Sequence, residues 1–138
     1  MKQGKIMALD YGEVRIGIAM TDMLQTIASP FETYKRKSVE KDLDYLADLA
    51  KENFVSEIVM GLPLNMDGTE GDRASKTREF GDKLKEKSGL EIVYVDERLT
   101  SVEAEEILIE SGMRREKRKE VIDKIAASLI LESYLNRL

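Results

Sequence analysis

The chain has 138 residues, of which 42% are hydrophobic and 36% are charged, and its formal net charge is −5. Cysteine and histidine are absent, which excludes disulfides, zinc sites built on thiolate or imidazole ligands, cysteine nucleophiles and Ser-His-Asp triads. Any chemistry must therefore rest on carboxylates, lysine, arginine, tyrosine or hydroxyl groups. Carboxylate oxygens are the ligands that suit hard cations such as Mg²⁺ and Mn²⁺.

The length fits one compact domain over residues 1–138, since a chain of this size buries roughly two thirds of its unfolded surface in a single core. No internal repeat, low-complexity tract or linker interrupts the sequence. No segment approaches the roughly 20 apolar residues that a membrane span needs, and the start of the chain leads directly into a strand pattern rather than a signal peptide. We expect a cytoplasmic protein with no membrane partner.

The acidic balance argues against a protein that coats nucleic acid through bulk electrostatics, although local contact remains compatible with it. Two basic clusters stand out, at residues 35–37 and 114–119. Each cluster alone is equally well explained as solvated charge near a helix end. Charge by itself therefore leaves a nucleic-acid partner open.

The first part of the chain has the pattern of a β-hairpin followed by a third strand. Residues 5–21 contain two apolar runs separated near Gly12, which predicts two strands joined by a tight turn. Residues 25–34 are expected to add the third strand. Pro30 within that strand indicates an edge position or a bulge, because proline cannot donate to the sheet.

The rest of the chain alternates helical and strand patterns. Ser38 is the expected N-cap of the first helix, and Thr100 with Glu103 forms a capping box for a later one. We expect helices at 39–54, about 73–87, 100–111 and about 117–137, strands at 57–61 and 90–96, and a turn-rich loop at 62–71. Hairpins followed by helical crossovers predict an α/β fold, with a mixed five-stranded sheet flanked by helices.

Four acidic residues occupy positions where strands end or where a helix is apolar. Asp10 ends the first strand, and Asp96 and Glu97 follow the strand at 90–96. Because strand side chains alternate between the two faces, only one of Asp96 and Glu97 can share a site with Asp10. Asp123 lies on the apolar side of the last helix, where neighbouring alanines allow close approach to the sheet. These positions predict a carboxylate cluster at the strand ends.

Each acid also has a structural explanation. Asp10 could accept backbone N–H bonds from the turn that follows, Asp96 or Glu97 could favour the next helix N-terminus electrostatically, and Asp123 could pair with a basic residue one turn earlier. Together, however, strand-end acids and a helix acid facing them favour a cage of oxygen ligands. Two divalent ions about 3.5–4 Å apart in such a cage can promote in-line attack on a phosphodiester.

Residues 61–71 carry three glycines between a strand and a helix. Backbone N–H groups there could approach a phosphate. The spacing fits neither a P-loop nor a dinucleotide fingerprint, so an ordinary loop with an Asp-Gly turn is favoured. If the loop is functional, Arg73, Lys76 and Arg78 in the following helix would supply phosphate contacts.

Four ordered segments together resemble the YqgF family, also called RuvX. They are 8–12 with 15–19, 61–63 with 66–68, 96–100, and 123–127 with 130–131. The resemblance spans almost the whole chain and departs from the family pattern little, with Ser101 standing where threonine is usual. It implies a ribonuclease H-like fold related to the RuvC Holliday-junction resolvases. It also implies that Asp10, Glu97 and Asp123 stand at the positions of the catalytic, metal-binding acids.

The resemblance therefore implies a Mg²⁺- or Mn²⁺-dependent endonuclease. Its implied role is rRNA processing at the 5′ end of pre-16S rRNA, in ribosome biogenesis. Position in the sequence suggests phosphate contacts from Arg15, Arg73, Lys76, Arg98, Arg114 and Arg115.

Three alternatives stay open. The same acids could act on four-way DNA junctions, which calls for a homodimer because symmetric resolution needs two active sites. The hairpin at 10–12 is also similar to that of actin-like or sugar-kinase-like nucleotide binders, and a non-catalytic binding module could carry the acids for structural reasons. Mg²⁺ or Mn²⁺ should raise the melting temperature only if the acids form a site.

Overall fold

The computed structural model describes residues 3–98 and 100–138. Leu99 of the third family segment, and the side chains of Thr100 and Ser101 at the expected capping box, lie outside the described part. No helix within these ranges is both long and apolar enough to cross a membrane.

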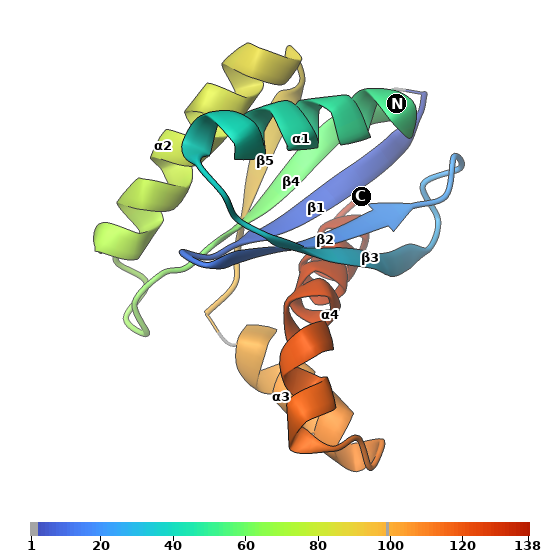
Figure 1. Cartoon of the computed structure of the whole chain (residues 1–138), viewed down its shortest axis with the longest axis vertical. Coiled ribbons are helices and arrows are strands. Elements are labelled where there is room, and N and C mark those ends of the chain that lie inside the picture. Colours follow the sequence, from blue (N-terminus) through green and yellow to red (C-terminus); the bar gives the residue numbers. More distant parts are fainter. Residues whose placement is uncertain (1–2, 99) are drawn as a thin grey trace.

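A five-stranded mixed sheet forms the centre of the molecule, with strand order β3-β2-β1-β4-β5 (Figure 1). The β1–β2 and β2–β3 pairs are antiparallel, whereas β1–β4 and β4–β5 are parallel. The strands are β1 Lys5–Tyr11, β2 Arg15–Thr21, β3 Ala28–Lys35, β4 Val55–Leu62 and β5 Glu91–Asp96. The α/β fold class and the mixed five-stranded sheet expected from the sequence are thus confirmed.

The third strand begins at Ala28, so the expected start at residue 25 was wrong. The carboxylate of Asp22 accepts backbone N–H bonds from Thr26 at 2.7 Å and Ile27 at 2.9 Å, which closes these residues into a turn. Pro30 lies on the edge strand β3, opposite a register irregularity between Ile18 and Ala19. Both the edge position and the bulge expected from this proline are confirmed.

Two helices cover one face of the sheet and a third crosses the other (Figure 1). Helices α1 Val39–Glu52 and α2 Asp72–Ser88 pack together, and α4 Arg115–Leu135 contacts β1, β2 and β3. Helix α3 Thr100–Glu110 packs on α4, and the two form a hairpin that extends beyond the sheet. The Ser38 hydroxyl accepts the Lys41 N–H at 3.2 Å, as expected for an N-cap.

The core is divided between the two faces of the sheet because strand side chains alternate. On β1, Met7 and Leu9 belong to the cluster under α1 and α2, whereas Ile6 and Ala8 belong to the cluster under α4. Asp10 continues the second series, so its side chain belongs to the α4 face. The small side chains of this face let α4 approach the sheet closely.

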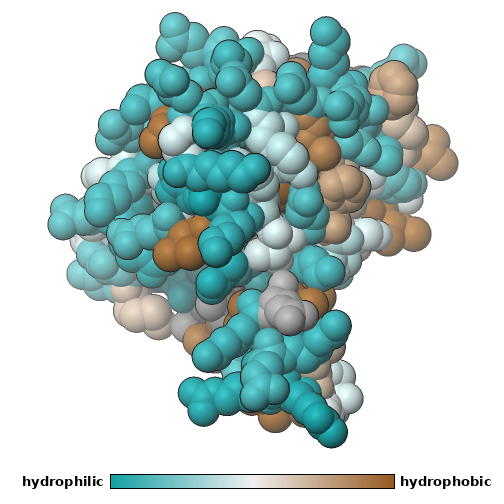
Figure 2. Space-filling view, in the orientation of Figure 1, coloured by the Kyte–Doolittle hydropathy of each residue, from teal (hydrophilic) through white to brown (hydrophobic). Residues whose placement is uncertain are grey.

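The molecular surface in Figure 2 is mainly hydrophilic. Apolar side chains are exposed around the β2–β3 turn, where Met23, Leu24, Ile27 and Phe31 lie. This turn joins β2 and β3 at the end of β2 remote from Arg15. The exposed apolar group is therefore separated from the acids described next.

Candidate active site

Asp10 and Glu97 meet on the α4 face at the ends of β1 and β5, the two strands that flank β4. Glu97 follows β5, and its backbone N–H donates to the Leu62 carbonyl at 3.2 Å, which continues the pairing with β4 by one residue. The Glu97 side chain is 8% exposed, and its carboxyl group is hydrogen-bonded to that of Asp10. Asp96 instead pairs with Arg98 at 2.8 Å. The expectation that only one of the two acids shares a site with Asp10 is confirmed, and that acid is Glu97.

The two acids hold a proton between them. Burial, followed by the charge of Asp123, raises the pKa of Asp10 to about 6, although the Glu97 hydrogen bond and the charge of Arg73 oppose this rise. Burial, followed by the charge of Asp10, raises the pKa of Glu97 to about 8. At neutral pH the Glu97 carboxyl is therefore the protonated partner and donates to the Asp10 carboxylate.

Asp123 lies beside this pair, but its carboxylate is engaged by another residue. The Arg15 Nε donates to Asp123 Oδ2 at 2.6 Å. Arg118, one of the alternative partners expected one turn earlier, pairs with Glu105 at 3.1 Å. Within residues 3–98 and 100–138, no three carboxylates gather closely enough to form a metal site. The structure thus brings two of the three acids into contact and places the third next to them.

Two glycines let these acids meet, and sequence reasoning missed their role. Gly17 is paired with Asp10 across β1 and β2, and a Cβ at Gly17 would stand 1.9 Å from the Asp123 carbonyl oxygen. A Cβ at Gly61 would stand 2.5 Å from Ile130 Cδ1 and 2.9 Å from Glu97 Cδ. A glycine inside an apolar strand run was the available signal, because it often marks close approach of another segment.

Replacing Gly17 with alanine is expected to destabilise the fold by about 2–3 kcal/mol, since the new methyl group would meet helix backbone rather than a flexible side chain. The displacement of α4 should also weaken Mn²⁺ binding. Urea unfolding and calorimetric titration measure the two effects. Gly71→Ala serves as the control, because Gly71 has a negative φ and a Cβ there would come no closer than 3.4 Å to the Asn65 side chain. A Gly17→Ala variant as stable as wild type would contradict the close approach.

Three of the expected phosphate-contacting residues lie around the β1–β2 turn that follows Asp10. Arg73 and Lys76 line a pocket of about 330 Å³ whose opposite wall is the β1–β2 turn at Tyr11, Gly12 and Glu13. The charge of Arg73 reaches both acids, since it opposes the rise in pKa of each. Lys76 Nζ lies 3.5 Å from a carboxylate oxygen of the largely exposed Glu13. Arg15, paired with Asp123, is the third residue.

The other expected phosphate-contacting residues are Arg98, Arg114 and Arg115, which do not line the pocket beside the β1–β2 turn. Arg98 donates to the Met66 carbonyl at 3.0 Å as well as pairing with Asp96. Arg114 and Arg115 stand exposed at the start of α4, about two helical turns before Asp123. Arg98 nevertheless lines a pocket of about 260 Å³ together with Glu97.

The loop between β4 and α2 is a closed turn. The Asp67 carboxylate accepts the Thr69 N–H at 2.9 Å, and Gly68 adopts a positive φ of 89°. Arg78 is paired with Glu70 at 2.8 Å. This confirms the interpretation of an ordinary loop with an Asp-Gly turn, and it leaves Arg78 engaged within the protein.

Comparison with known sequences gives matches along nearly the full chain. The sequence pattern of the RuvX family, described as Holliday junction resolvase, matches residues 4–137. A protein of Endomicrobium trichonymphae named "Putative pre-16S rRNA nuclease" is 52% identical over 133 residues, covering 96% of this chain and 95% of that protein. A Halothermothrix orenii protein with the same name is 49% identical over 132 residues, covering 96% and 94%.

Solved structures show the same fold at low sequence identity. Thermus thermophilus RuvC, solved in complex with a Holliday junction substrate, has a TM-score of 0.58 at 10% identity, covering 97% of this chain and 95% of that chain. The fowlpox virus Holliday junction resolvase has a TM-score of 0.57 at 17% identity, covering 97% and 99%. The sheet order and the likeness to these structures thus define a ribonuclease H-like fold. The chain belongs to the RuvX family.

Proposed function

We propose that this protein is a metal-dependent endonuclease that hydrolyses nucleic-acid phosphodiester bonds, and that its substrate is the 5′ end of pre-16S rRNA. The observation that carries the proposal is the contact between the buried carboxyl groups of Asp10 and Glu97 at the ends of β1 and β5, which flank β4. The rRNA substrate is supported by the names of the relatives that are 49–52% identical.

The donor set suits Mg²⁺ or Mn²⁺. Asp10 and Glu97 supply only oxygen ligands, and burial together with the charge of a neighbouring acid raises the pKa of each. A divalent cation held by these two residues would replace the shared proton. Asp123 would complete the site by exchanging Arg15 for the cation. When bound, such a cation activates water and stabilises the departing oxygen of the phosphodiester.

The protein's own groups then have distinct tasks. Glu97 gives up its proton to solvent, so that both carboxylates are charged. Arg73 and Lys76 bind the phosphates of the substrate strand across the pocket beside the β1–β2 turn. Arg15, once released from Asp123, adds a positive charge on the other side of the acids. These residues orient the nucleic-acid strand with respect to the acids.

Replacing Lys76 with alanine is expected to raise KM roughly fivefold, equivalent to about 1 kcal/mol, with kcat nearly unchanged. The slope of log affinity against log salt should fall by about one, because one phosphate contact is lost. Lys87→Ala is the matched control, since Lys87 lies at the far end of the same helix and pairs with Asp44. Steady-state kinetics at several salt concentrations measure KM and the salt dependence. Equal KM values for the two variants would contradict phosphate binding in this pocket.

A four-way DNA junction is the second candidate substrate, favoured by the description of the matching family as Holliday junction resolvase. Precursor 16S rRNA and a four-way junction should be incubated side by side with the protein and Mn²⁺. Specific cleavage of the RNA alone supports the proposal. Symmetric cleavage of the junction by a dimer would transfer the assignment to DNA, and failure to cut either substrate would remove the nuclease proposal.

A further inference from the structure

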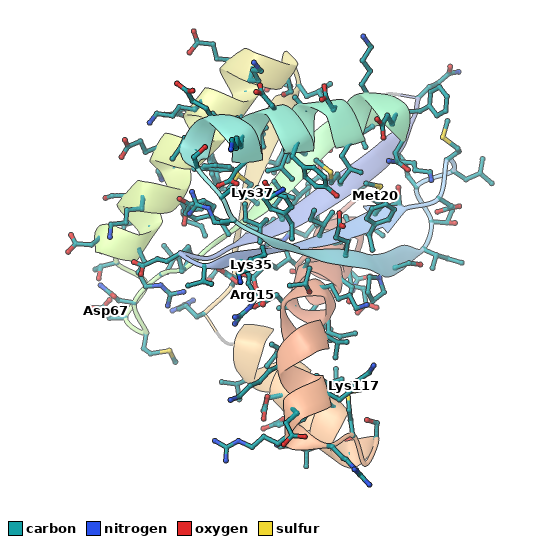
Figure 3. All side chains as sticks on the ribbon, in the orientation of Figure 1. Arg15, Met20, Lys35, Lys37, Asp67 and Lys117 are labelled. Atoms are coloured by element: carbon teal, nitrogen blue, oxygen red, sulfur yellow. The ribbon has the colours of Figure 1, made fainter. Side chains whose placement is uncertain are left out.

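The basic segment at residues 35–37 does not behave as uniformly solvated charge. Lys35 and Lys37, labelled in Figure 3, are exposed, whereas the Arg36 side chain is only 13% exposed. Its Nε donates to Asp42 Oδ2 at 2.8 Å. Asp42 lies in the first turn of α1 and its side chain is completely buried. The central residue of this basic segment is therefore part of the protein interior.

The Asp42 carboxylate is saturated by its neighbours. Besides Arg36, it accepts the Tyr34 hydroxyl at 2.9 Å and the Lys37 backbone N–H at 2.9 Å. A buried carboxylate with this many donors holds its cation in one orientation, because moving the cation would leave a charge unpaired in the interior. Asp42 thus holds the Arg36 guanidinium in a fixed position against α1.

The other arm of Arg36 reaches the β1–β2 turn. Its Nη1 donates to the Tyr11 hydroxyl at 2.8 Å and to the Gly12 carbonyl at 3.1 Å. The guanidinium also lies over the rings of Tyr11, at 4.7 Å, and of Phe80 in α2, at 5.4 Å. One side chain therefore ties the turn to both helices on this face of the sheet.

The turn that Arg36 holds carries two members of the active site. Asp10 immediately precedes it, and Arg15, the partner of Asp123, immediately follows it. The Gly12 N–H donates to the Arg15 carbonyl at 3.0 Å, and the Arg36 N–H donates to the Val14 carbonyl at 2.9 Å. A shift of this turn would therefore displace both residues with respect to Glu97 and α4.

We propose that Arg36 is a positioning residue, which holds the turn at Tyr11 and Gly12 so that Asp10 stays against Glu97. This role rests on the proposed nuclease function of those acids. Arg36 itself is assigned no contact with substrate or metal.

The test replaces Arg36 with lysine, which keeps the charge but cannot bond Asp42, Tyr11 and Gly12 at once. We expect faster hydrogen exchange of the Gly12 amide, Mn²⁺ affinity lowered about tenfold, and kcat lowered about tenfold with KM unchanged, because a small misplacement of a reacting group is costly. Tyr11→Phe removes only the hydroxyl contact and should give smaller changes in the same direction. It also serves as the test variant if Arg36→Lys does not fold.

Tyr134→Phe is the matched control. It removes a hydrogen bond of 2.6 Å between Tyr134 and Glu57, at the opposite end of β4 from the active site. If the Tyr11 and Arg36 variants resemble this control in Gly12 exchange, Mn²⁺ affinity and kcat, the positioning role is overturned. If the wild-type protein cleaves no nucleic acid, the proposed function fails, and hydrogen exchange with Mn²⁺ affinity still decides the role of Arg36.

Discussion

Asp10→Asn is expected to abolish Mn²⁺-dependent cleavage, with a loss on the order of a thousandfold or more, while the metal-free protein becomes more stable at pH 8. Activity should disappear because the substitution removes the carboxylate that contacts Glu97 and faces Asp123. Stability should rise because the same carboxylate is held in a buried and negatively charged place. The two effects have one electrostatic origin and opposite signs.

The sign of the stability effect follows from proton linkage. The pKa of Asp10 is raised from 3.8 to about 6, so between these values the folded protein binds more protons than the unfolded chain. Its stability contribution therefore falls as pH rises through this window, by about 3 kcal/mol in all. Asparagine carries no such cost, so the advantage of the variant should be largest at pH 8 and should shrink toward pH 4.

Thermal melts at pH 5 and pH 8, with cleavage assays on the same samples, measure both effects. Asp96→Asn is the matched control, because Asp96 is one residue from Glu97 but its hydrogen bonds with Arg98 lower its pKa. This control should keep activity and gain no stability at pH 8. An active Asp10→Asn protein would exclude Asp10 as a metal ligand. An unchanged melting temperature at pH 8 would show that the buried charge of Asp10 does not destabilise the fold.

The stabilisation given by Mn²⁺ should increase steeply between pH 6 and pH 8. Binding must displace the proton shared by Asp10 and Glu97, whose pKa values are about 6 and about 8. Affinity should therefore rise about tenfold per pH unit wherever one proton is released per ion bound. Melting temperatures at a fixed Mn²⁺ concentration report this rise. Titration calorimetry in two buffers of different ionisation enthalpy counts the protons directly.

Glu97→Gln separates this proton release from other effects of pH. Glutamine can still donate a hydrogen bond to Asp10 but has no proton to lose, so the variant should bind Mn²⁺ weakly at every pH and should release fewer protons. Asp96→Asn should behave as wild type. A Mn²⁺ shift that is equal at pH 6 and pH 8 in the wild-type protein would show that the ion does not bind at the shared proton.

Much of the fold and part of the site were predictable because they depend on local periodicity. Alternation along a strand predicted that only one of Asp96 and Glu97 could share a site with Asp10, and in the structure that acid is Glu97. The alanines around Asp123 indicated close packing on the sheet. Both predictions required only the repeat of a strand or helix, which the sequence carries within a few residues.

The remaining features depend on contacts between distant segments. Arg15 pairs with Asp123 across 108 positions, which no local pattern reveals. Arg36 stands between two exposed lysines, so its charge alone suggested solvent, although the partner that holds it inside lies in α1. The helix backbone that lies against Gly17 belongs to a distant segment, so the residues around Gly17 do not reveal the contact. The positions of the acids were thus easier to predict than the contacts that orient them.

The irregular edge of β3 has a consequence for the protein in a crowded cell. Pro30 offers no N–H donor, and the break in register beside it kinks the outermost strand. A straight outer strand can recruit strands of other molecules and begin aggregation, whereas a kinked strand with a missing donor is a poor template. Pro30 therefore makes this edge of the sheet a poor template for pairing with strands of other molecules.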